Sequence, residues 1–320
     1  TLALSVTSHA GGTTDYILGD SDTAEITILD INQTSALTFD AIIKSEHANS
    51  VTGITIDDNA SIAAPDTITF NRAVTVDTII VGNAGETAGD ATFNAAVAIT
   101  TGTINGGDAS EVSKVTFAST VAGTVNINDD DAEAQAIFSG TTAIVAATIQ
   151  GTADGEGTVQ ITGSGKTFTG GIGETTGLQL LNADASVSLL NEVDFRDVDL
   201  ATGVTLTTDD AFQGDVTTLT GTAKFISATD AGGTATSAIG FTSLDGDDDG
   251  NGTIQVTNTS VSTFTGAIGV IKQLGLVDLD TSTTFVGVVD TAALTLAASA
   301  TATFDDDLTA TATTLTTSGI

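Results

Sequence analysis

The chain has 320 residues, and its 7 lysines and arginines against 41 aspartates and glutamates give a formal net charge of −34. A negative field of this size excludes nucleic acids and anionic membrane surfaces as partners. The chain has no cysteine, which excludes disulfides and thiolate metal sites, and no apolar stretch of roughly 18 residues, which argues against a membrane span.

Aromatic residues make up only 4% of the chain, so a core has to be built from Val, Ile, Leu and Ala, with Phe as the large residue. The abundant Thr and other β-branched residues favour strands. No apolar pattern with a period of 3.6 residues is long enough to indicate a helix. The composition therefore predicts an all-β protein.

Residues 1–32 predict two strands separated by a turn. Residues 1–7 alternate between apolar and polar side chains, residues 9–15 are a turn cluster, and the stretch from Tyr16 to Asp30 alternates again. The run from Tyr16 through Gly19 to the segment 24–30 resembles the last two strands of a Calx-β domain. That domain is a calcium-binding, immunoglobulin-like sandwich found in tandem in bacterial surface proteins.

The Calx-β resemblance implies that residues 1–32 are the C-terminal strands of such a sandwich, a partial β-sandwich hairpin. It also implies that Asp30 is a calcium ligand, because an Asp near the final strand helps to bind calcium in that family. The alternative is an ordinary hairpin that Asp30 caps. Residues 33–66 follow as a transition, with strands expected at 36–43 and 51–56, before Pro65 ends the segment.

Residues 67–320 contain a degenerate repeat, Thr-Phe-x-(small)-x-(Val/Ile/Leu), with a period of roughly 20–30 residues. Clear copies begin at Thr69, Thr92, Thr116, Thr167, Thr263, Thr284 and Thr303. Short strands separated by Gly, Asn and Asp turns at this period predict a parallel β-helix, or β-solenoid, in which each repeat is one coil. Tandem antiparallel sandwiches are the alternative, but they need a period of about 80–100 residues, which the chain lacks.

The repeat also predicts where its side chains point. Phe at one repeat position should stack on Phe of the next coil inside the solenoid, and the preceding Thr should form an outward-facing column. Two stretches lengthen the repeat, residues 151–157 and 224–241, and insertions in solenoids form loops that leave the body.

The segment Asp245–Gly252 is the strongest candidate site. It contains Asp-x-Asp-x-Asp-Gly, in which alternating carboxylates converge on one ion and glycine permits the sharp turn. We therefore expect calcium ligands at Asp245, Asp247, Asp249 and Asn251. Val256 stands where an EF-hand has its bidentate Glu, so the loop is not an EF-hand, and a solvated Asp/Gly turn is the alternative.

An enzyme is not expected. β-Helical enzymes that act on acidic sugars need carboxylates clustered with Lys or Arg, and this chain has scattered cations, one Tyr and no Trp. Ice binding by flat Thr arrays is disfavoured because paired Thr-x-Thr does not recur at one repeat position.

The repeat, the cysteine-free acidic composition and the Calx-β-like start together resemble repetitive bacterial surface proteins: S-layer proteins, adhesins and extracellular fibre subunits. This resemblance implies an extracellular location on a bacterial cell surface and a calcium-stabilised structural segment that assembles with other copies of itself. The alternative is the rigid stalk of a calcium-dependent adhesin, with a cell-surface glycan as partner. The chain contains no Met and no visible signal peptide, so we expect it to be a piece of a longer polypeptide.

Overall fold

The computed structural model describes residues 17–18, 28–32, 37–40, 42–44, 53–57, 67–83, 88–106, 112–129, 133–141, 144–228, 238–259 and 261–315. Every regular element among them is a strand, which confirms the predicted all-β class. Within these ranges there is no helix that is long and apolar enough to cross a membrane.

The chain forms two compact units, residues 1–159 and 160–320. The strands of the first unit are β1 (Ile17–Leu18), β2 (Ile28–Asn32), β3 (Leu37–Phe39), β4 (Ile42–Lys44), β5 (Gly53–Asp57), β6 (Thr67–Phe70), β7 (Val74–Val81), β8 (Asp90–Phe93), β9 (Val97–Asn105), β10 (Ser113–Phe117), β11 (Val121–Asn128), β12 (Ala134–Phe138) and β13 (Ile144–Gly151). β14 (Thr158–Ile161) lies at the boundary between the units.

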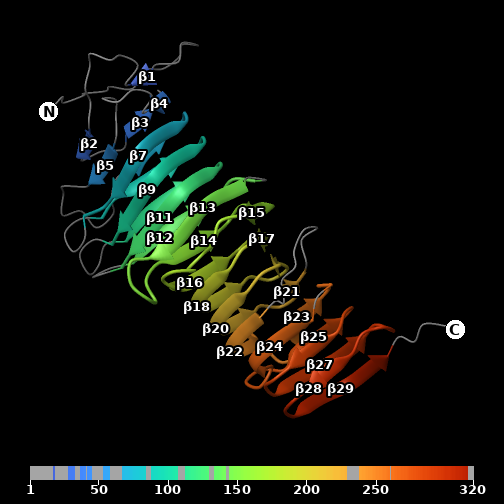
Figure 1. Ribbon diagram of the computed structural model, residues 1–320. Helices are drawn as coiled ribbons and strands as arrows, with labels where there is room; N and C mark the ends of the chain where they lie inside the picture. The colour runs from blue at the N-terminus through green and yellow to red at the C-terminus, as the bar shows by residue number, and fades with distance from the viewer. Residues whose placement is uncertain are drawn as a thin grey trace. The chain divides into compact units, whose positions relative to one another are not determined.

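Short and long strands alternate in the first unit, and each pairs in parallel with its equivalent one coil away. The short strands form the series β6, β8, β10 and β12, and the long strands form the series β7, β9, β11 and β13. Figure 1 shows the long strands side by side. A chain whose strands recur once per coil, each paired in parallel with the equivalent strand of the next coil, forms a β-solenoid, as the repeat predicts.

The phenylalanine column of the first unit has the predicted form. Phe39, Phe70, Phe93, Phe117 and Phe138 occupy equivalent positions in successive coils. Their rings stack with centroid separations of 5.1, 4.7, 5.6 and 5.5 Å. The preceding threonines are also in register and stay at least partly exposed, so the outward Thr column is confirmed here: Thr38, Thr69, Thr92 and Thr116.

The described strands near the N-terminus pair in the same parallel way. β1 pairs with β4, and β2 pairs with β5, with Asp30 opposite Thr55. β3 pairs in parallel with β6, and β4 with β7. Most of residues 1–32, including the expected turn, lies outside the described residues, so the Calx-β resemblance stays a prediction.

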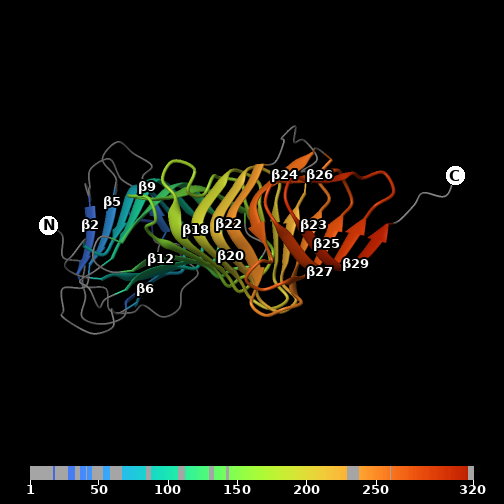
Figure 2. The same ribbon diagram turned by 90° about the horizontal axis from the view of Figure 1, so that it is seen from below.

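The strands of the second unit are β15 (Lys166–Phe168), β16 (Leu178–Ala183), β17 (Val187–Leu189), β18 (Val193–Leu200), β19 (Thr205–Thr208), β20 (Phe212–Leu219), β21 (Lys224–Ser227), β22 (Ala238–Gly246), β23 (Asn251–Val256), β24 (Ser262–Ile268), β25 (Leu274–Leu279), β26 (Thr283–Phe285), β27 (Val289–Leu296), β28 (Ala302–Phe304) and β29 (Leu308–Leu315). Two parallel series again build the coils, the even-numbered strands from β16 to β28 and the odd-numbered strands from β15 to β29. Figure 2 shows β23, β25, β27 and β29 in order.

The Phe residues of the second unit do not share one position. Phe264, Phe285 and Phe304 form one stacked column. Phe168, however, is in register with Leu189, and Phe225 lies between Leu206 and Ile254. The expectation of a single Phe position is therefore wrong for this unit, because more than one inward-facing position of a coil accepts a large apolar side chain.

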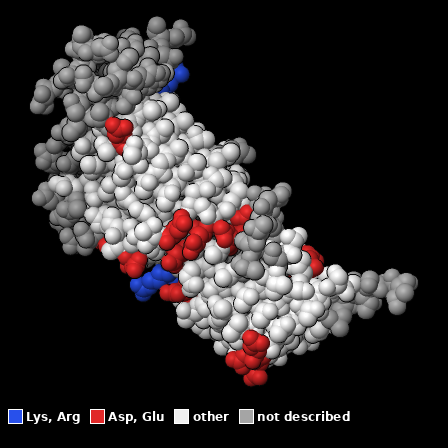
Figure 3. Space-filling view, in the orientation of Figure 1, with Lys and Arg blue, Asp and Glu red and all other residues white. Residues whose placement is uncertain are grey.

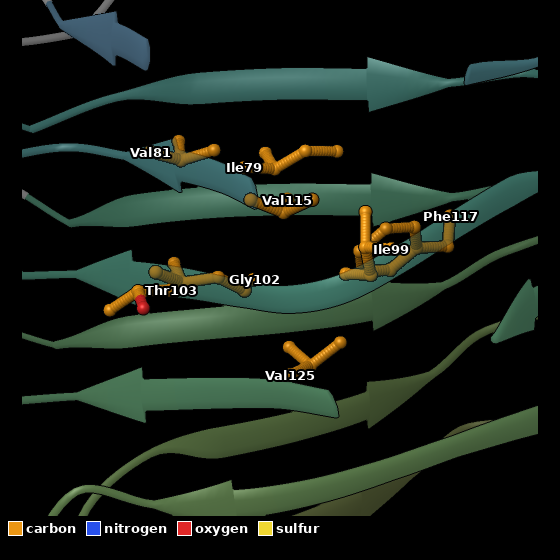
Figure 4. A pocket seen from close by; sticks show the side chains of 9 residues that line it. Ile79, Val81, Ile99, Gly102, Thr103, Val115, Phe117 and Val125 are labelled. Atoms are coloured by element: carbon orange, nitrogen blue, oxygen red, sulfur yellow. The ribbon is translucent and has the colours of Figure 1, made fainter. Parts of the chain in front are cut away.

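The core of the first unit contains a small gap beside Gly102. Gly102 takes an inward position between Ile79 and Val125, where the neighbouring coils carry branched side chains. The missing side chain leaves an apolar cavity of about 10 Å³, lined also by Ile99, Val115 and Phe117 (Figure 4). A space of this size is at the lower limit for one water molecule and is apolar, so it is a packing defect rather than a ligand site.

Lys166 is a charged side chain in the core of the second unit. It is 1% exposed, and its Nζ has no hydrogen-bond partner in the structure. Burial lowers the pKa of Lys166 because the apolar surroundings disfavour the ammonium form. Folding therefore has to remove a proton from this group or bury an unpaired charge.

Replacing Lys166 with methionine should stabilise the second unit, by about 1–3 kcal/mol at pH 7. The pKa of Lys166 is lower in the folded protein than in the unfolded chain, so the unfolded chain binds more protons. Burial of Lys166 therefore lowers the free energy of unfolding, and this penalty is complete at pH values below the folded-state pKa. The penalty vanishes above the unfolded value, about 10.5, so the gain from Lys166→Met should shrink as the pH rises toward it. Urea unfolding at several pH values measures this gain.

The control for this substitution is Lys224→Met, because Lys224 is an exposed lysine in β21. It should change the free energy of unfolding by no more than about 0.5 kcal/mol at any pH. A gain from Lys166→Met that is equal at every pH would contradict the assignment, since it would indicate improved packing rather than removal of a titrating group.

Candidate functional site

The acidic segment Asp245–Gly252 comprises the end of β22, a tight turn and the start of β23. The Asn251 N–H donates to the Asp248 carbonyl over 3.1 Å. Gly250 and Gly252 have φ angles of 87° and 77°, a region that glycine adopts without strain. The predicted role of glycine in a sharp turn is confirmed.

Two carboxylates of the turn bind the following coil. Asp245 is 8% exposed, and its Oδ1 accepts hydrogen bonds from the Ile271 and Lys272 N–H groups at 2.9 and 3.3 Å. Asp249 Oδ1 accepts one from the Gln273 N–H at 3.1 Å. These bonds satisfy backbone donors in the turn after β24, which would otherwise lack partners.

Asp247 binds in the opposite direction, to the preceding coil. Its Oδ1 accepts hydrogen bonds from the Gly221 N–H and from Asn251 Nδ2, both at 2.8 Å. The Gly221 donor, followed by Asn251, lowers the pKa of the Asp247 carboxyl below its ordinary value. The turn thus links three successive coils of the second unit.

The predicted calcium ligands therefore lie in one turn, but their carboxylates diverge. Asp245 and Asp249 reach residues 271–273, whereas Asp247 reaches Gly221. Among the described residues no group of three or more His, Cys, Asp or Glu is placed to hold a metal ion. The side chain of Asp30 lies outside the described residues. Calcium binding stays a prediction, and these carboxylates would have to turn toward a common ion.

Removing the Asp245 carboxylate should destabilise the second unit. Asp245→Ala leaves the Ile271 and Lys272 N–H groups without their acceptor, and we expect a loss of about 1–3 kcal/mol. Thermal unfolding in a calcium chelator measures this loss without a contribution from bound ion.

Asp248→Ala is the matched control within the same turn. The Asp248 carboxylate is exposed and lies 3.3 Å from Lys272 Nζ, and an exposed ion pair of this kind contributes about 0–1 kcal/mol. Its Oδ1 also accepts the Asp249 N–H at 3.1 Å, but that N–H is exposed and can bond to water when the carboxylate is removed. Equal losses in the two variants would show that the turn responds to charge alone and would contradict the hydrogen-bonding role of Asp245.

Polar ladders at the coil corners were not predicted. In the first unit, Asn94 Nδ2 donates to Asn71 Oδ1 at 2.8 Å, and Asn128 Nδ2 donates to Asn105 Oδ1 at 3.1 Å. Each pair is separated by 23 residues, so a search for Asn at the repeat period would have found both. These hydrogen bonds between side-chain amides connect adjacent coils in addition to the backbone pairing.

On the face shown in Figure 3, the acidic side chains of the described residues gather in patches among uncharged residues. On β18, burial raises the pKa of Asp199, and the charge of Asp197 raises it further, although a hydrogen bond from Thr218 opposes both effects. Ionising Asp199 therefore costs more than ionising a solvated aspartate, and cations in solution should reduce the part of this cost that the charge of Asp197 causes.

A groove of about 160 Å³ lies on the second unit over β15, β17 and β19. The outward residues Thr167, Ser188 and Thr207 line it, and these are neighbours in register. Ser186 and Thr205 complete its hydroxyl lining. Lys166 also contributes to the lining, so the groove offers hydroxyl hydrogen bonds to a polar ligand beside one lysine side chain.

No protein-family model, curated protein or solved structure matches the chain, and the likeness to bacterial surface proteins therefore rests on its sequence pattern alone.

Proposed function

We propose that the chain is a structural segment of an extracellular surface layer or filament, which associates with other copies of itself and is stabilised by calcium. The observation that carries this proposal is the in-register coil-to-coil ladder within each unit. Backbone hydrogen bonds, stacked Phe rings and Asn–Asn hydrogen bonds all connect one coil to the next. Such a ladder resists bending and separation because every coil is tied to its neighbours along its length.

The charge of the chain supports an extracellular role in the presence of divalent cations. A net charge of −34 keeps a protein soluble, but it also makes copies repel one another. Calcium bound to acidic turns such as residues 245–252 would reduce that repulsion. An ion bound there would draw these carboxylates together, in place of the hydrogen bonds that they now make to the two neighbouring coils.

Electron microscopy of the purified chain tests this function, with calcium at about 1 mM, the range of extracellular calcium modules, and after chelation. The expected result is ordered filaments or sheets with calcium and dispersed particles without it. Isolated particles under both conditions would overturn the self-assembly proposal.

An adhesin stalk is the second candidate, and the hydroxyl-lined groove over β15, β17 and β19 favours it. A stalk would remain monomeric and contact a cell-surface glycan through such a groove or through other domains. Isolated particles that bind a glycan array, with loss of binding in Thr207→Val, would support this candidate.

A further inference from the structure

Residues 269–273 form a loop that the next coil does not match. The flanking residues Ile268 and Leu274 are in register with Val289 and Thr291 of that coil. The loop therefore lies opposite the one residue between them, and strand pairing cannot satisfy all of its backbone N–H groups. Other acceptors have to satisfy them, because a backbone N–H without a partner is unfavourable where water is excluded.

The carboxylates of the acidic turn supply these acceptors. Asp245 Oδ1 accepts hydrogen bonds from the Ile271 and Lys272 N–H groups, at 2.9 and 3.3 Å. Asp249 Oδ1 accepts one from the Gln273 N–H, at 3.1 Å. Three consecutive N–H groups of the loop thus depend on two carboxylates, and we call these three hydrogen bonds the latch.

The other contacts of the loop leave these N–H groups dependent on the latch. The side chains of Val270 and Ile271 are 52% and 74% exposed, so apolar packing contributes little to holding the loop. The Gly246 and Gly250 N–H groups donate to loop carbonyls over 3.3 and 2.9 Å. These two bonds position the loop beside the turn, but they satisfy its carbonyls and not its donors.

A cation bound by the acidic turn would compete with the latch. The spacing Asp-x-Asp-x-Asp-Gly binds calcium when its carboxylates converge on one ion. Here Asp245 and Asp249 reach the following coil, and Asp247 reaches the preceding one. To reach a common ion, the first two have to turn away from residues 271–273. The same carboxylates therefore serve either the ion or the loop.

We propose that the hydrogen bonds of Asp245 and Asp249 are a cation-released latch: a divalent cation bound by these carboxylates frees the N–H groups of residues 271–273. This inference rests on the proposed calcium binding and describes its consequence. The coupling is reciprocal, because hydrogen bonds that an ion has to break lower the affinity for that ion. Calcium would then favour association of copies by reducing their repulsion, not by strengthening the link between these coils.

Amide hydrogen exchange of the whole chain, resolved by NMR, tests the latch with calcium at about 1 mM and after chelation. The N–H groups of Ile271, Lys272 and Gln273 should exchange at least about tenfold faster with calcium, because their acceptors are then occupied. An ion that only braced the turn would slow the same exchange. Calorimetric titration of the same sample with calcium reports separately whether the ion binds.

Asp245→Ala tests the latch without an ion. In chelator it should speed exchange of the two N–H groups that donate to this carboxylate by at least about tenfold, and calcium should add no further increase at these two groups. Asp248→Ala is the matched control, because this carboxylate contacts the loop through the Lys272 side chain rather than a backbone N–H. It should leave exchange of residues 271–273 in chelator unchanged.

The outcomes separate this inference from the proposed function. If calcium binds and the three N–H groups exchange at an unchanged or slower rate, the latch is overturned while calcium binding stands. If the titration shows no binding, the proposed calcium binding and the latch both fall. Binding with faster exchange, reproduced without calcium by Asp245→Ala and not by Asp248→Ala, supports the latch.

Discussion

Phe285→Ala is expected to lower the free energy of unfolding of the second unit by about 3–5 kcal/mol. The Phe285 side chain is 0% exposed, and its ring stacks on Phe264 and Phe304 with centroids 5.2 Å away on each side. Removing the ring takes apolar contacts from two neighbouring coils and leaves a cavity that the paired backbone cannot close. Urea unfolding followed by circular dichroism gives the change.

Phe304→Ala provides the matched control. Phe304 belongs to the same column but stacks on one described ring and is half-buried. Its loss should cost about half as much, because about half of the contacts disappear. Equal losses at the two positions would contradict the view that stacking on both sides sets the stability of this column.

The solenoid was predictable from the sequence because its cause is local and repeated. Each Thr-Phe pair places Thr outward and Phe inward on a strand, and a spacing near one coil length brings successive pairs into register. Thr92-Phe93 and Thr116-Phe117 do this in the first unit, and Thr284-Phe285 and Thr303-Phe304 do it in the second.

The position of Phe168 was not predictable in the same way. A coil has several inward-facing positions, and the period alone does not say which of them a given Phe takes. Phe168 pairs with Leu189 because the strands around it set the register, and this depends on the lengths of turns distant from the Thr-Phe pair itself.

The acidic turn shows the same limit at the level of single side chains. The spacing Asp-x-Asp-x-Asp-Gly is typical of calcium loops, and it correctly indicated a sharp turn. The direction of each carboxylate depends on backbone donors 26 residues away, Gly221 for Asp247 and Ile271 for Asp245. Local spacing carries no information about donors in neighbouring coils.

Gly123→Ala is expected to destabilise the first unit by about 3 kcal/mol or more. Gly123 has a φ of 112°, a backbone conformation that residues with a side chain rarely adopt. A Cβ at this position would lie 1.8 Å from the Ile99 carbonyl oxygen. That oxygen belongs to the paired strand β9, so relief of the clash would require the β9–β11 ladder to separate. Thermal unfolding monitored by circular dichroism measures the loss.

Gly102→Ala in β9 is the matched substitution, and it should have the opposite sign. A Cβ at Gly102 would lie 2.8 Å from Ile99 Cδ1, the end of a side chain that can turn toward the small cavity beside it. Alanine also restricts the unfolded chain, so we expect a gain of about 0.4–1 kcal/mol. If both substitutions destabilised equally, tight packing around any added methyl group would explain the result. Opposite signs would show that the register shift between Ala122 and Thr124, where β9 has one residue more than β11, depends on the backbone conformation that glycine adopts at Gly123.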